Sequence, residues 1–206
     1  EIVFGDWSSY VCSSDLTGYP IVLTNALDQD CDNTGCAGVT MQMADGMKQA
    51  IRHLASCSYR RLAIIANETP FPRILAMSHK EIITECKGND MECDPEVIVM
   101  LPDDRATVEN TVRELLSRHD RPDAFIVEMS QTTRYICEAI SKCHLEVGKD
   151  IGVIAYTSQD KAFAAGNISS LDQDLAGLAR KSYQLMLESA KRSEEHTSEL
   201  QSPNTI

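Results

Sequence analysis

Five short, nearly continuous runs of apolar residues constrain the fold of this chain more than any other feature. Apolar runs of this length are typical of strands that are buried on both faces of a parallel sheet. The runs lie at residues 20–25, 60–67, 96–101, 123–129 and 150–156. Two shorter strands are expected at 39–41 and 167–171.

Amphipathic helices are expected between these runs. In the first helix, apolar side chains recur at the i, i+3, i+4, i+7 spacing of one helical face, at Met47, Ala50, Ile51 and Leu54. Helices are expected at 44–57, 73–86, 105–119, 132–144 and 172–191. We expect Pro70 and Pro72 to open the second helix, Asp172 to cap the last one, and residues 27–40 to form a polar loop. This alternation predicts an α/β fold with helices covering parallel sheets.

Parallel strands end at a common edge, and ligands of such sheets collect there. Polar residues follow four of the expected strand ends, at Thr24–Asn25, Ala66–Asn67, Met129–Ser130 and Tyr156–Thr157. The sequence therefore predicts a ligand site at this edge without naming the ligand.

The two ends of the chain are related to each other through the genetic code. Residues 192–202 (RSEEHTSELQS) can be back-translated so that the reverse complement encodes DWSSDVCSSDL, which differs from residues 6–16 only at Tyr10. An inverted DNA repeat of this kind is typical of translated sequencing-library adapter. We therefore expect 1–16 and 192–206 to be adapter-like, non-native segments and the rest to be truncated at both natural ends. The alternative is a genuine Ser-rich disordered tail.

The charge balance argues against direct DNA binding. The formal net charge is −12, and it remains −7 without the two end segments, which carry six acidic residues and one basic residue. Contacts with phosphates need clustered Lys and Arg, which this chain does not supply. No apolar stretch is long enough to span a membrane, so no membrane partner is expected.

The cysteines indicate reduced thiols rather than a metal site or disulfides. Seven lie outside the end segments: Cys31, Cys36, Cys57, Cys86, Cys93, Cys137 and Cys143. No CxxC pair occurs, and the spacing does not match known zinc sites. An odd number of cysteines, several on helical faces, favours a cytosolic protein with buried thiols. No metal and no cofactor are expected.

Catalytic motifs are missing from the sequence. It has no P-loop, no dinucleotide-binding glycine fingerprint and no nucleophile elbow. His53 stands beside Leu54 on an expected helix, where a structural role is more common than a catalytic one. Asp103 and Asp104 are interpreted as helix-capping and loop residues. We therefore do not expect an enzyme.

Three segments resemble the effector-binding domain of LacI/GalR-type transcriptional regulators. GMKQAIRHLASCSYRRLAIIAN (46–67) resembles a helix and strand of that family, and RPDAFIVEMSQTTRYICEAISKCHLEVGKDIGVIAYTSQD (121–160) resembles its strand–helix–strand element. ISSLDQDLAGLARKSYQLMLES (168–189) resembles its last strand and helix. The order and spacing hold through nearly all of 17–191.

The resemblance implies a two-lobe, periplasmic-binding-protein-like (type I) α/β fold with an incomplete near lobe. By this analogy, residues 17–67 form part of the N-terminal lobe and 68–170 form the C-terminal lobe. Residues 171–191 form a helix that returns to the N-terminal lobe.

The resemblance also implies a ligand cleft between the lobes. Its positions fall on Asn25, Arg73, Met129, Ser130, Tyr156 and Thr157. At several of these positions, this chain differs from the residues that are usual in the family. Met129–Ser130 and Thr157 stand where the family has acidic or amide residues. The family's sugar-gripping Arg falls at 75–77, which is apolar, with Arg73 as the nearest substitute. The effector is expected to be sugar-like or a less polar small molecule, unless the site has degenerated.

The expected function is ligand sensing in a cytoplasmic, homodimeric transcription regulator. DNA contacts would come only from an N-terminal headpiece outside this chain. Two alternatives remain open: a periplasmic or extracellular sugar-binding protein of a transporter, and the sensor domain of a signalling enzyme.

Overall fold

The computed structural model describes residues 21–24, 28–41, 43–68, 77–127, 130–157 and 167–200. The chain divides into two compact units. Unit 1 consists of residues 1–41 and 174–206, and unit 2 consists of residues 42–173.

Unit 2 contains a five-stranded sheet in which every neighbouring pair of strands is parallel. The strands lie in the order β4-β3-β5-β6-β7. Their bounds are β3 (Leu62–Asn67), β4 (Ile98–Leu101), β5 (Ala124–Val127), β6 (Gly152–Thr157) and β7 (Ser169–Asp172). The predicted α/β class with parallel sheets is confirmed.

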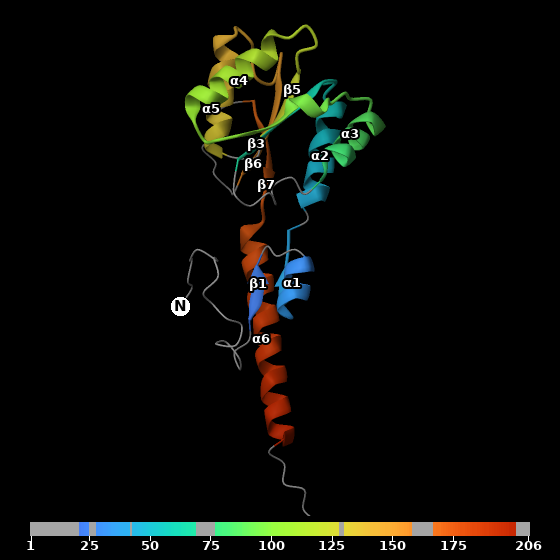
Figure 1. Ribbon diagram of the computed structural model, residues 1–206, viewed down its shortest axis with the longest axis vertical. Helices are drawn as coiled ribbons and strands as arrows, with labels where there is room; N and C mark the ends of the chain where they lie inside the picture. Colours follow the sequence, from blue (N-terminus) through green and yellow to red (C-terminus); the bar gives the residue numbers. More distant parts are fainter. Residues whose placement is uncertain are drawn as a thin grey trace, which may run out of the picture. The chain divides into compact units, whose positions relative to one another are not determined.

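Helices cover both faces of this sheet (Figure 1). They are α2 (Met43–Ser56), α3 (His79–Gly88), α4 (Arg105–Ser117) and α5 (Ser130–Lys142), and a short 3₁₀ helix, η2 (Pro95–Val97), precedes β4. Helix α3 connects β3 to β4, whereas α4 leads back across β3 to β5. Because crossovers between parallel strands are right-handed, these opposite directions place α3 beside α2 on one face and α4 beside α5 on the other.

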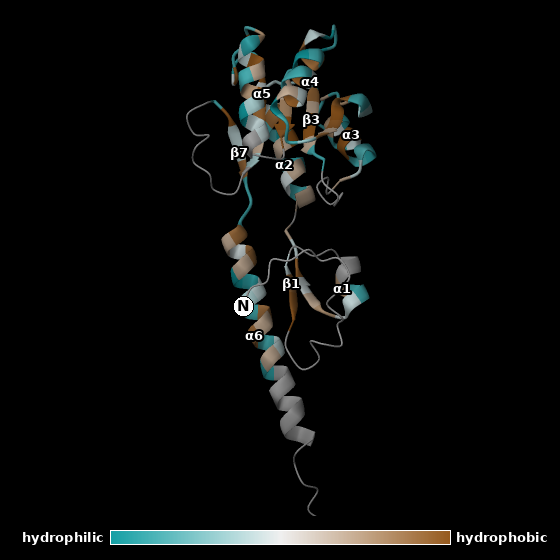
Figure 2. Cartoon of the chain, turned by 60° about the vertical axis from the view of Figure 1, so that its left-hand side comes forward, coloured by the Kyte–Doolittle hydropathy of each residue, from teal (hydrophilic) through white to brown (hydrophobic). Residues whose placement is uncertain are grey.

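The core of unit 2 is centred on β3 and β5. All four residues of β5 are fully buried, and so are residues 62–66 of β3. Their apolar side chains point to both faces, where they meet the buried stripes of the helices, such as Ile51 and Leu54 of α2. Figure 2 shows hydrophobic strands next to helices in which hydrophilic and hydrophobic residues alternate.

Unit 1 contains two short parallel strands and a long helix. The elements are β1 (Val22–Thr24), α1 (Asp28–Thr34), β2 (Ala37–Val39) and α6 (Leu175–Leu200). Helix α6 packs against both strands. The predicted polar loop at 27–40 instead contains α1, and the predicted strand at 39–41 begins two residues earlier as β2.

The division between the two units differs from the predicted lobe boundary. The prediction placed residues 17–67 in the N-terminal lobe, but α2 and β3 belong to unit 2. The physical reason is that β3 forms backbone ladders with β4 on one side and β5 on the other, so it cannot be separated from that sheet. The second boundary, between 173 and 174, lies near the predicted one at 170.

Two helix starts also differ from the predictions. Helix α3 begins at His79, and Ser78 before it forms a capping box with Glu81. Met77 and Ser78 are not helical, so the prediction of a helix over 73–86 is wrong at these two residues. Helix α6 begins at Leu175, and the carboxylate of Asp174 accepts a hydrogen bond from the Gly177 backbone N–H (2.7 Å). The predicted cap, Asp172, lies in β7 instead.

Replacement of Ser78 by Ala removes the hydroxyl that accepts from the Glu81 backbone N–H and leaves that donor without its cap. We expect the free energy of unfolding to fall by about 1 kcal/mol. The control, Ser117→Ala, removes a hydroxyl that, among the described residues, donates to the Glu114 carbonyl alone, and a change of less than about 0.5 kcal/mol is expected. Urea unfolding of the full chain measures both; equal losses would contradict the capping role.

Replacement of Gly152 by Ala places a methyl group against the Tyr59 ring. The new Cβ would lie 2.5 Å from Cε2 of Tyr59 and 2.8 Å from two further ring atoms. Because the ring must shift, we expect a loss of about 1–3 kcal/mol in unfolding free energy. The control is Gly88→Ala, where a Cβ meets nothing within 4 Å, and it should leave stability unchanged or raise it slightly.

Candidate ligand site

The strand order of unit 2 creates a switch point at the carboxyl edge of the sheet. The chain leaves β3 toward α3 on one face and leaves β5 toward α5 on the other face. Connections that diverge in this way leave a crevice beyond the carboxyl ends of the two strands, which is where ligands bind in open α/β sheets. Two residues lie on either side of the switch point along the chain. Asn67 is half-buried at the end of β3, and Ser130 is the first residue of α5.

The neighbouring part of the edge is built by the connection after β4 and the first turn of α5. The hydroxyl of Thr132, which is 2% exposed, donates to a carboxylate oxygen of Asp103 at 3.4 Å. Asp104 caps α4: its carboxylate accepts from the hydroxyl of Thr107 at 2.6 Å and from the Thr107 backbone N–H at 2.8 Å. These hydrogen bonds hold the pKa of Asp104 below its usual value, so the carboxylate is charged at neutral pH.

The opposite part of the edge is closed by the beginning of α2. Tyr156 of β6 is buried (3% exposed), and its hydroxyl lies 3.6 Å from the position that a Cβ on Gly46 of α2 would take. The Leu171 side chain of β7 lies closer still, at 2.7 Å from that position. Gly46 therefore allows α2 to approach β6 and β7 closely, so that α2 packs directly over this corner of the sheet.

The predicted site residues fall in different places. Tyr156 and Thr157 are the last two residues of β6, and Thr157 is in register with Asp172 of β7. Ser130 begins α5, directly after the neighbouring strand β5, so it shares the carboxyl edge with them. Asn25, Arg73 and Met129 lie outside the described residues.

Asp103 and Thr132 lie at this edge, although they were not predicted as ligand residues. The sequence contained a usable signal, because Asp103 follows the end of β4 by two positions, about as closely as Ser130 follows β5. Burial of the Thr132 hydroxyl depends on the packing of α5 and had no signal in the sequence. Within the described part of the chain, no group of His, Cys, Asp and Glu side chains is arranged to hold a metal ion.

His53 lies away from this edge and makes local contacts. Its Nε2 is 3.2 Å from the Ser169 hydroxyl at the start of β7 and 3.9 Å from the thiol of Cys57. Since β7 starts at the amino edge of the sheet, these contacts tie the end of α2 to that edge. They agree with the structural role predicted for His53.

The sequence profile of the periplasmic binding protein-like domain matches residues 51–206. The chain therefore belongs to this family, and the periplasmic-binding-protein-like α/β fold implied by the sequence is confirmed. No curated protein sequence matches the chain.

Solved structures of LacI family regulators share the fold. A LacI family transcription regulator from Clostridium acetobutylicum is 14% identical, with a TM-score of 0.68 over 83% of this chain and 70% of that one. One from Bifidobacterium animalis subsp. lactis DSM 10140 is 17% identical, with a TM-score of 0.71 over 87% of this chain and 72% of that one. One from Lactobacillus casei with bound glucose is 16% identical, with a TM-score of 0.61 over 83% of this chain and 63% of that one.

Helix α6 is the longest helix described, yet neither it nor any other helix in the described ranges combines the length and apolar character needed to cross a bilayer.

The lowered pKa of Asp104 gives the edge a testable acid dependence. A carboxylate whose folded pKa lies below its unfolded value stabilises the fold above the unfolded pKa, and this contribution is lost as the pH falls through the folded pKa. Asn caps helices about as well as Asp but does not titrate. At neutral pH, we expect the Asp104→Asn variant to have the same free energy of unfolding as the original chain. Between about pH 5 and about pH 2, we expect the variant to lose less of this free energy than the original chain does. Urea unfolding at both pH values checks this, and parallel losses in the two chains would contradict it.

Proposed function

We propose that this chain is the effector-sensing domain of a LacI/GalR-type transcription regulator, and that a small molecule binds at the carboxyl edge of the unit 2 sheet. In the intact protein, the ligand would shift an equilibrium between two conformations by its differential affinity for them. That shift would change the geometry of paired DNA-binding headpieces in a homodimer.

The switch point between β3 and β5 is the observation that carries this proposal. It follows from the strand order β4-β3-β5-β6-β7 alone and does not depend on any single side chain. Two of the proposed ligand residues support it, because Thr157 ends β6 and Ser130 begins the helix that follows β5. Met129 and Arg73 lie outside the described residues and are proposed from the sequence alone.

The side chains favour an uncharged, hydrogen-bonding effector. Asn25, Ser130 and Thr157 offer amide and hydroxyl groups, whereas the ring of Tyr156 is buried against the start of α2. Groups of this kind suit a sugar-like molecule, whose hydroxyls both donate and accept hydrogen bonds. The glucose bound to the Lactobacillus casei regulator supports the same class of ligand.

DNA would be contacted by a headpiece outside the printed sequence, because the net charge of −12 opposes phosphate binding by this chain. Free thiols at seven described cysteines support a reducing, cytoplasmic location and weigh against a secreted transport protein.

A thermal-shift screen of the full chain with hexoses, pentoses and less polar metabolites tests the proposal. A ligand present at about 100 times its Kd should stabilise the fold by about 2.7 kcal/mol. For a chain of this size, that corresponds to a rise in Tm of roughly 5–10 °C. The double variant Asn25→Ala/Thr157→Ala should reduce or abolish the shift.

Thr84→Ala is the matched control, because Thr84 is exposed on α3 and its hydroxyl bonds only the Lys80 carbonyl among the contacts described. This variant should keep the full ligand-induced shift. Stabilisation by hexoses that survives unchanged in the double variant would refute the assignment of these site residues.

A further inference from the structure

A hydrogen-bonded turn fixes the position of Cys57, the residue directly after α2. The backbone N–H of Ser58 donates to the Ala55 carbonyl at 3.0 Å, and that of Tyr59 donates to the Leu54 carbonyl at 3.2 Å. Ser58 has a positive φ of 71°. These two bonds form the Schellman motif that commonly ends a helix. Cys57 is therefore held at a defined place and is not carried on a free loop.

The exposed thiol of Cys57 faces the imidazole of His53. The Cys57 backbone N–H donates to the His53 carbonyl at 3.1 Å, which continues the helical turn and puts both side chains on one face of the helix. The Cys57 sulfur lies 3.9 Å from Nε2 of His53. The same nitrogen lies 3.2 Å from the Ser169 hydroxyl, a contact that holds the ring in this position. An accessible sulfur thus meets a nitrogen that can accept its proton.

The end of α2 is prepared for a negative charge on this sulfur. The last carbonyls of a helix carry a partial negative charge, which opposes a thiolate nearby. Here the guanidinium of Arg60 donates to the carbonyls of Ala55 (3.1 Å) and Tyr59 (2.8 Å), and the Ser56 hydroxyl donates to the His53 carbonyl at 2.7 Å. The positive charge of Arg60 and these hydrogen bonds offset the negative end of the helix.

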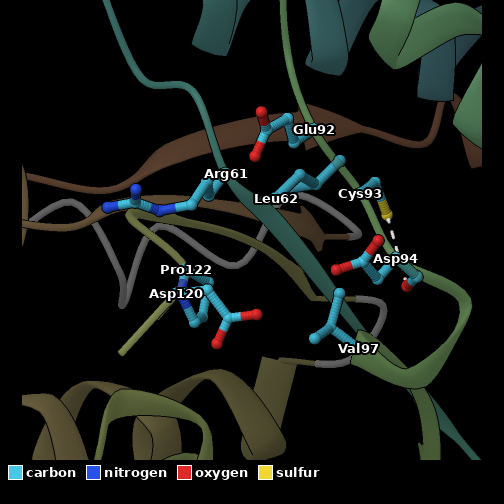
Figure 3. Close-up of a pocket in the computed structure, with 8 residues that line it drawn as sticks. All are labelled: Arg61, Leu62, Glu92, Cys93, Asp94, Val97, Asp120 and Pro122. Atoms are coloured by element: carbon cyan, nitrogen blue, oxygen red, sulfur yellow. Dashed lines mark hydrogen bonds between the residues drawn. The ribbon is translucent and has the colours of Figure 1, made fainter. Parts of the chain in front are cut away.

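The other described thiols lack this combination of access and chemistry. Cys93 is 7% exposed and lines a pocket of only about 40 Å³, with its sulfur 4.0 Å from the Asp94 carbonyl (Figure 3). A volume of this size holds water but excludes a tripeptide such as glutathione. Burial raises the pKa of Cys137 to about 11, so little of it is thiolate at neutral pH. Among the described cysteines, Cys57 is the only exposed one.

We infer that Cys57 is a modification site for low-molecular-weight disulfides such as oxidised glutathione, and that His53 accepts the thiol proton as the sulfur attacks. This inference does not rest on the proposed ligand function, because Cys57 lies at the amino edge of the sheet, where α2 leads into β3.

The reaction balances with the disulfide as the only oxidant. The Cys57 proton moves to Nε2 of His53, and the sulfur attacks one of the two sulfurs of oxidised glutathione. The original S–S bond breaks as the new one forms, and the leaving thiolate takes the proton from His53. Cys57 is oxidised to a mixed disulfide, and one glutathione is released as its thiol.

The experiment follows this reaction at each cysteine. The reduced full chain is incubated with oxidised glutathione at neutral pH, and samples are blocked with iodoacetamide over time and digested with trypsin without reduction. Cys57 then lies on peptide 53–60 and Cys93 on peptide 88–105. We expect the glutathione adduct to form on peptide 53–60 at least about tenfold faster than on peptide 88–105. Equal rates at the two cysteines would overturn the inference.

Unfolding in urea gives a comparison that needs no variant. Urea exposes Cys57 fully, but it also separates the sulfur from His53, because no helix then holds the two residues one turn apart. The rate constant for Cys57 should therefore be several times higher in the folded chain than in urea. A rate constant in urea that equals or exceeds the folded value would show that exposure alone explains the reaction, and the inference would be wrong.

The variant His53→Gln separates proton transfer from a structural role. Glutamine can still form a hydrogen bond with Ser169, but it cannot take up a proton at neutral pH. We expect the rate constant for Cys57 to fall about tenfold, because less of the sulfur attacks as thiolate. A purely structural role of His53 would lower the midpoint of urea unfolding and leave this rate constant unchanged.

His79→Gln is the matched control, because His79 is exposed at the start of α3. This variant should keep the full rate at Cys57. The assignment of His53 fails if His53→Gln reacts as fast as the unaltered chain, and the comparison in urea decides the question if that variant does not fold.

Discussion

The backbone ladders on both sides of β3 are the constraint on which unit 2 depends. Because β3 pairs with β4 on one side and β5 on the other, the connections before and after β4 must run in opposite directions. That requirement places α3 and α4 on opposite faces and sets the switch point between the ends of β3 and β5. It also brings α2, which leads directly into β3, into the same unit.

The strands of unit 2 could be predicted because burial on both faces demands continuous apolar residues. Phe125 and Ile126 of β5 show this most clearly, since neither has any exposed surface. Helix boundaries were harder to predict, because the decisive interactions are local hydrogen bonds. Ser78 with Glu81 begins α3 although Pro70 and Pro72 offered a stronger sequence signal, and Asp174 caps α6 although Asp172 was an equally good candidate.

The candidate site could be predicted as an edge but not as a set of side chains. Strand ends are a consequence of topology, so Tyr156, Thr157 and Ser130 fall at the expected edge. The contact between Thr132 and Asp103 arises from the packing of α5 beside the β4 connection, which joins residues 29 positions apart. Likewise, the place of α2 depends on which sheet accepts β3, and the unit boundary at residues 41–42 therefore differs from the lobe boundary that the resemblance implied.

The continuity of unit 2 along the chain has a consequence for folding during synthesis. Residues 42–173 are contiguous, whereas unit 1 combines β1 and β2 from one end with α6 from the other. On the ribosome, β1 and β2 emerge first but wait for their helix until more than a hundred further residues have been added. At about 5–20 residues per second, that delay lasts roughly 7–30 seconds. During this interval, unit 2 can fold completely while two short apolar strands remain uncovered, so chaperone binding should concentrate near residues 22–39.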